Sequence, residues 1–190
     1  MGGLARHAPH ALRTAISYGD LRTKGDGIYT VTFKERDEET NRWRETKVQV
    51  DGELYVRANG ELLFGHSSGA SDSKKMKPWV AIAGKAYAKW RGGYGVLGDG
   101  VGTAKEVFEA FLGRRGHGFE LAPPAGHREE AWKRIRASLD AGTPVAAATF
   151  RHRDGLYVNS GLFAHHSYTV VKYEGVRGSE RTVELYNLWG

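Results

Sequence analysis

The order of the hydrophobic patterns along the chain constrains the fold most. Alternation of apolar and polar residues, which is typical of strands, occurs near residues 28–50 and again after residue 143. The region between these two groups has the three- and four-residue apolar spacing of helices. Strands that are grouped, rather than alternating singly with helices, predict an α+β fold built from antiparallel hairpins.

The first group of predicted strands follows an N-terminal helical pattern. Leu4–Ile16 has one apolar helical face, and Pro9 inside it predicts a kink or a late helix start. A turn is expected at residues 25–27. Strands are then expected at residues 28–33 and from Trp43 to Val50, with the polar run 36–42 between them and the second strand continuing to residue 56. Asn59-Gly60 predicts a further hairpin within residues 58–64.

Three helices are expected in the middle of the chain. The first, within residues 77–94, carries a Trp79, Tyr87 and Trp90 stripe that we assign to the core, and it should end at Gly92-Gly93. The second should follow Thr103, where a threonine cap and a glutamate three residues later form a capping-box pattern. The third should cover residues 128–142.

The length and composition predict one globular domain. The 190 residues, 40% of them hydrophobic, are enough for a sizeable core. We divide the domain into residues 1–75 with a helix and hairpins, 76–142 that are helical, and 143–190 that form a sheet. No apolar run has the length of a membrane span and no signal peptide is apparent, so the compartment stays open, with the cytoplasm favoured.

The charge of the chain favours no particular partner. A net charge of +6 could serve a nucleic-acid surface, but the basic residues are scattered and, in the segment Lys34–Arg44, interleaved with acidic ones. A nucleic-acid-binding domain is therefore the least favoured of the functions considered. The chain has no cysteine, which excludes disulfides, thiolate zinc sites and a cysteine nucleophile among these residues.

A histidine and an asparagine flank the last predicted hairpin. Residues 143–150 form a predicted buried strand, and two strands follow with a turn near residues 176–180. The turn should fold His166 and Asn187 back together as a cross-strand pair, about 5 Å apart. Thiol proteases use histidine as the proton acceptor and a third residue to orient it. An ordinary half-buried histidine is the alternative, and His165 and His166 cannot chelate a metal together because strand neighbours point to opposite faces.

Several motifs in the same order resemble the catalytic domain of the calpain family of cysteine peptidases. His165-His166-Ser167-Tyr168-Thr169-Val170 is similar to the family's Gly-His-Ala-Tyr-Ser/Thr-Val, and Tyr186-Asn187-Leu188-Trp189-Gly190 to its Arg-Asn-Pro-Trp-Gly. Residues 85–100 resemble its Glu-Lys-Ala-Tyr-Ala-Lys helix and the Gly-Tyr turn after it. Residues 48–68 resemble its Val-Val-Asp-Asp-x-Leu-Pro and Gly-x-Leu-Leu-Phe-x-His-Ser segments.

The resemblance implies a papain-like fold with a Cys/His/Asn triad in which His166 and Asn187 are catalytic. In the family the cysteine stands in Gly-Asp-Cys-Trp at the start of a long helix. Residues 2–16 resemble the second half of that helix, so the domain is expected to be truncated before the cysteine. The chain would then be inactive unless a cysteine-bearing segment lies upstream. The alternative is a non-catalytic remnant, or pseudoprotease, that acts as a binding module.

The remaining expectations also follow from the resemblance. Trp189 would either shield the His–Asn hydrogen bond or serve as a core aromatic. His165 and Leu188 replace the family's glycine and proline, which puts the loop shape beside His166 in question. The expected partner is a polypeptide substrate or another protein. Calcium is a possible ligand by resemblance alone, and no cofactor or metal-binding residue can be assigned.

Overall fold

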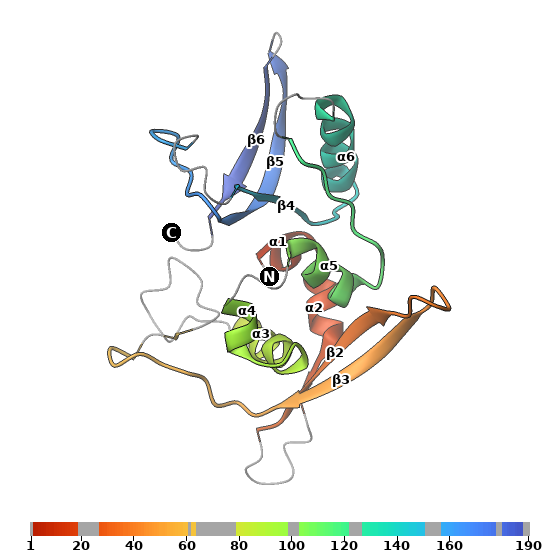
Figure 1. Cartoon of the computed structure of the whole chain (residues 1–190), viewed down its shortest axis with the longest axis vertical. Helices are drawn as coiled ribbons and strands as arrows, with labels where there is room; N and C mark the ends of the chain where they lie inside the picture. Colours follow the sequence, from red (N-terminus) through yellow and green to blue (C-terminus); the bar gives the residue numbers. More distant parts are fainter. Residues whose placement is uncertain are drawn as a thin grey trace. The chain divides into compact units, whose positions relative to one another are not determined.

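The computed structural model describes residues 2–18, 27–60, 62–63, 79–98, 103–121, 127–150, 157–177 and 180–187 (Figure 1). The expected turn at residues 25–26, the hairpin residues 61 and 64, and the expected turn residues 178–179 lie outside this set. The chain divides into two compact units, which are taken here one at a time. The first contains residues 9–116, and the second contains residues 2–8 and 117–188. The expected division into one domain with three parts stays a prediction.

The first unit is a three-stranded antiparallel sheet with helices. Its strands are β1 (Ile16–Tyr18), β2 (Tyr29–Arg36) and β3 (Trp43–Val50), in the order β1-β2-β3. Its helices are α2 (Pro9–Ala15), α3 (Trp79–Trp90), α4 (Tyr94–Gly98) and α5 (Ala104–Leu112). Helix α3 packs against β3 and α5 packs against β2. The mixed α+β character expected from the sequence is therefore present.

An aromatic cluster forms the centre of this unit. Phe33 of β2 is fully buried and stacks on Trp90 of α3, with the ring centroids 4.8 Å apart and the planes 4° apart. Edge contacts join Phe33 to Tyr87 and to Phe111 of α5. The apolar face of β2 and the apolar faces of α3 and α5 thus all contact the Phe33 side chain. Tyr87 is a core residue as expected, whereas Trp79 and Trp90 are only half-buried.

The second unit is also a three-stranded antiparallel sheet. Its strands are β4 (Val145–Ala148), β5 (Ser167–Arg177) and β6 (Glu180–Tyr186), in the order β4-β5-β6. Helix α6 (Arg128–Asp140) packs along β5 and β4, and α1 (Gly2–His7) packs on β5, where His7 Nε2 lies 3.0 Å from the Val170 carbonyl oxygen (Figure 1). Leu4, Ala131, Tyr168 and Val170 are buried in this unit.

The N-terminal helical pattern forms two helices, not one. Helix α1 ends at His7 and α2 begins at Pro9, because proline lacks the N–H that a continuous helix needs at that point. Ile16 is the first residue of β1, where it pairs with Val31, so the helix ends one residue earlier than predicted. The two helices belong to different units.

The strands after the first hairpin are shorter than the pattern predicted. Strand β3 ends at Val50, and only a single antiparallel bridge, between Val56 and Leu62, follows it around the Asn59-Gly60 turn. Strand β4 covers four residues, and these are half-buried or exposed rather than fully buried. Among the described residues, no helix is long and apolar enough to cross a membrane.

Candidate active site

His166 and Asn187 lie at the same end of the second sheet. His166 immediately precedes β5 and Asn187 immediately follows β6, and Thr169 pairs with Tyr186 across these antiparallel strands. The imidazole Nε2 of His166 lies 2.8 Å from the Asn187 Oδ1 atom. The two residues that the sequence analysis paired across 21 positions are therefore in direct hydrogen-bond contact.

This contact determines which imidazole nitrogen can act as a base. The amide oxygen of asparagine only accepts hydrogen bonds, so in a neutral imidazole the proton is on Nε2 of His166. Nδ1 then carries the lone pair and is the atom that can accept a proton. The arrangement is a half-buried imidazole whose ring is oriented by the asparagine.

Two aromatic rings flank the imidazole. Tyr168 contacts it edge-on at a centroid distance of 4.7 Å, and Phe163 does so at 6.1 Å. The Tyr168 ring is buried, whereas Phe163 is 62% exposed. Replacing water by rings on one side of a hydrogen bond lowers the local dielectric and strengthens that bond.

The loop that leads into His166 has an unusual backbone. His165 has a φ of 51°, in the left-handed region that favours glycine. The family motif that this segment resembles has glycine at this position, which put the shape of the loop in question. The structure gives His165 the conformation that a glycine would adopt with less strain.

The hydroxyl groups of a threonine and a tyrosine also hold this loop. The His166 amide N–H donates to Thr149 Oγ1 at 2.8 Å, and the Phe163 N–H donates to the Tyr168 hydroxyl at 2.7 Å. Sequence reasoning identified neither role. Tyr168 stands in a quoted motif and offered a signal, whereas nothing in the sequence distinguishes Thr149 from an ordinary strand residue.

The other predicted site features have no description in the structure. Trp189, with its expected shielding or core role, and Leu188 lie outside the described residues. Within the described ranges, no group of three or more His, Cys, Asp or Glu side chains is placed to hold a metal ion.

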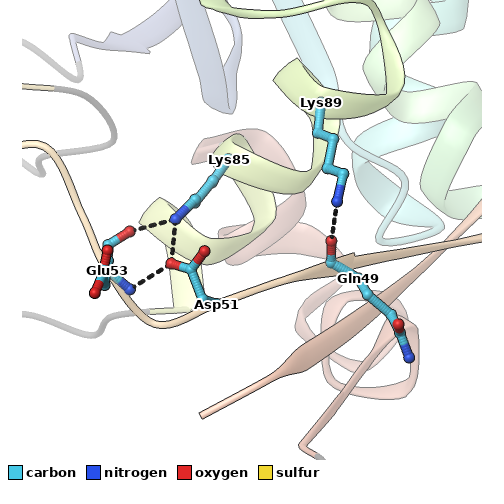
Figure 2. A network of polar contacts seen from close by, with 5 residues as sticks. All are labelled: Gln49, Asp51, Glu53, Lys85 and Lys89. Carbon is cyan, nitrogen blue, oxygen red and sulfur yellow. Dashed lines mark hydrogen bonds and ion pairs between the residues drawn. The ribbon is translucent and has the colours of Figure 1, made fainter. Parts of the chain in front are cut away.

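A second polar network lies in the first unit, away from any expected catalytic residue. Lys85 and Lys89, one turn apart on α3, extend toward the end of β3 and the segment after it (Figure 2). Lys85 Nζ donates to Asp51 Oδ1 and to the Glu53 carbonyl oxygen, and Lys89 Nζ donates to the Gln49 carbonyl oxygen at 2.9 Å. The network joins two segments that the sequence analysis matched to separate motifs.

The electrostatics of this network follow from its hydrogen bonds. The Asp51 carboxyl has a pKa below its ordinary value, chiefly because Lys85 donates to it and next because the Glu53 N–H does. The ionised carboxylate ties the chain after β3 to α3 at an exposed position. Its arrangement indicates a structural link between helix and strand.

Known proteins match most of the chain. A profile described as calpain family cysteine protease matches residues 4–190. The calpain-2 catalytic subunit of Gallus gallus is 34% identical over 151 residues, which are 75% of this chain and 20% of that protein. Calpain-8 of Homo sapiens is 29% identical over 175 residues, 90% of this chain and 23% of the relative. The chain thus spans about a fifth of the length of these relatives. No solved structure matches it.

Proposed function

The chain belongs to the calpain family of cysteine proteases, and on this basis we propose that it supplies the histidine and asparagine of a papain-like peptidase site. His166 would accept and return the proton of a cysteine thiol, and Asn187 would orient the imidazole. The observation that carries the proposal is the 2.8 Å contact between His166 Nε2 and Asn187 Oδ1. It leaves Nδ1 as the basic atom at the end of the sheet.

The chemistry requires a cysteine that these 190 residues do not contain. Nδ1 of His166 takes the thiol proton, which creates a thiolate and an imidazolium. The thiolate attacks the carbonyl carbon of a peptide bond, and the imidazolium gives its proton to the departing amine nitrogen. The acyl–enzyme thioester is then hydrolysed by a water whose proton passes to Nδ1, while the second product leaves as a carboxylic acid.

Asn187 suits this cycle because it is neutral. A carboxylate orienter would stabilise the imidazolium directly, whereas here the thiolate already supplies the negative partner. The amide oxygen holds the Nε2 proton in both charge states of the ring. It therefore keeps Nδ1 pointed in one direction throughout the reaction.

A second function is favoured by one observation, the absence of cysteine. A domain of this family that has no cysteine nucleophile would bind polypeptides or a protein partner without cleaving them. The two functions differ in whether a cysteine supplied to the domain creates activity.

The test is a fusion that adds a calpain-type segment with the Gly-Asp-Cys-Trp helix start to the N-terminus. We expect the 190-residue chain alone to be inactive and the fusion to hydrolyse a fluorogenic peptide. His166→Ala in the fusion should lower kcat/KM by roughly 10²–10⁴-fold, the usual contribution of a general base. Asn187→Ala should lower it by a smaller factor, because the base remains but is no longer oriented.

The matched control is His127→Ala, because this exposed histidine at the start of α6 caps nothing with its side chain. It should leave turnover unchanged. Full turnover in the His166→Ala fusion would refute the catalytic assignment. A folded fusion with an alkylatable cysteine but no hydrolysis would favour the binding module.

A further inference from the structure

The residue that follows β4 is hydrogen-bonded to the loop that carries His166. Thr149 N–H donates to the His166 carbonyl oxygen at 2.9 Å, and the His166 N–H donates back to Thr149 Oγ1 at 2.8 Å. Thr149 and His166 are thus joined by two hydrogen bonds, one from the backbone of Thr149 and one to its hydroxyl. Both backbone polar groups of His166 are satisfied by one residue, 17 positions away.

The Thr149 hydroxyl has one proton to donate, and the distances identify its acceptor. Thr149 Oγ1 lies 2.7 Å from the Phe163 carbonyl oxygen and 3.2 Å from that of His166. A hydroxyl donates one hydrogen bond and accepts others, so the shorter contact marks Phe163 as the acceptor. Thr149 therefore bridges both ends of the loop from Phe163 to His166.

This loop does not have the support of regular secondary structure. Residues 162–166 belong to no helix or strand, and His165 holds a left-handed backbone conformation. A left-handed non-glycine residue persists only where surrounding contacts determine it. Two further hydrogen bonds hold the loop: the His165 N–H donates to the Phe150 carbonyl oxygen at 3.2 Å, and the Phe163 N–H donates to the Tyr168 hydroxyl.

We propose that Thr149 is a positioning residue for His166: its hydroxyl fixes the loop so that the imidazole reaches Asn187. The inference rests on the function proposed above, since positioning matters catalytically only if His166 is the base. Without the hydroxyl, the His166 N–H and the Phe163 carbonyl lose their partner together. The loop can then relax the left-handed backbone at His165, and relaxation moves the imidazole away from the asparagine oxygen.

The proposal is tested on the 190-residue chain by NMR, and no cysteine is needed. The signal to follow is the Nε2–H proton of His166, which the Asn187 oxygen should protect from exchange with water. Thr149→Val removes the hydroxyl at nearly constant volume and should speed this exchange roughly tenfold or more, the effect of losing one or two hydrogen bonds. Thr149→Ser keeps the hydroxyl and should restore slow exchange.

The matched control is Thr14→Val in α2, whose hydroxyl bonds only to carbonyls of its own helix. It should leave the His166 signal unchanged. If Thr149→Val does not fold, the wild-type chain still decides: the backbone N–H of His166 must exchange slowly, because Thr149 Oγ1 accepts it. Exchange of that amide at the rate of an unprotected loop would overturn the inference.

The outcomes separate this inference from the proposed function. A protected Nε2–H that persists in Thr149→Val overturns the role of Thr149 and leaves the His166–Asn187 pair intact. A wild-type chain with no protected Nε2–H, and no change in Asn187→Ala, would remove the pair itself and with it the proposed function.

Discussion

The left-handed backbone at His165 predicts which of two substitutions, glycine or alanine, gives the more stable protein. With a φ of 51°, any side chain at this position places its Cβ close to the following carbonyl, which costs roughly 1–2 kcal/mol in the left-handed region. Glycine avoids this cost, but the greater conformational entropy of its unfolded chain lowers the free energy of unfolding by about 0.5–1 kcal/mol relative to alanine. The difference predicts that His165→Gly is more stable than His165→Ala by about 0.5–1 kcal/mol.

The comparison of glycine with alanine isolates the backbone, because both variants lose the imidazole and whatever it contacts. Thermal unfolding followed by circular dichroism should give a melting temperature a few degrees higher for His165→Gly, since about 1 kcal/mol shifts the midpoint by roughly 2–4 °C in a chain of this size.

The same pair of substitutions at an ordinary helical position should give the opposite sign. Lys133 is an exposed residue in the interior of α6, where glycine is less favourable than alanine by roughly 1 kcal/mol. Lys133→Gly should therefore melt below Lys133→Ala. Equal stabilities at position 165, or a more stable alanine variant there, would refute the left-handed conformation and the strain derived from it.

Two further perturbations test the first unit. Phe33→Ala removes the fully buried ring of the aromatic cluster and should lower the free energy of unfolding in urea by about 3–5 kcal/mol. Phe119→Ala, at an exposed ring, should lower it far less, and similar losses in the two variants would contradict the cluster as the core. The pKa of the Asp51 carboxyl, followed by NMR, should lie below 3.8, so its link to Lys85 is present above pH 3.8 and is lost as pH falls through the lowered pKa. An unchanged pKa in Lys85→Met would contradict the hydrogen bond as the cause.

Features with local chemistry were predictable from the sequence. Helix α5 begins after Thr103, whose side chain accepts from the Glu106 N–H while the Glu106 carboxylate accepts from the Thr103 N–H. It ends before Gly113, which has a φ of 64°. Each of these signals lies within a few residues of the boundary that it determines, so no knowledge of the fold is needed to read it.

Features that depend on distant contacts were not predictable. Strand β1 has three residues and no clear alternation, and it exists because β2 offers it a pairing edge. Strand β3 ends where Asp51 turns toward Lys85, a partner 34 residues away. The bonds from Thr149 to the His166 loop are of the same kind, since any threonine hydroxyl could make them. Periodicity carries no information about such partners.

The pairing of His166 with Asn187 was predicted from the hairpin, but the hairpin alone does not produce it. Thr169 pairs with Tyr186, so continuing that register would set Tyr168, not His166, opposite Asn187. His166 is two residues farther along, on the same face as Tyr168, in a diagonal position where neighbouring residues are about 7–8 Å apart and their Cβ atoms somewhat closer. A contact of 2.8 Å across that diagonal requires the imidazole to be directed along the strand end. The hydrogen bonds from Thr149 act on the backbone of His166, and the left-handed turn acts on that of its neighbour His165, so the geometry of the pair depends on the loop as much as on the sheet.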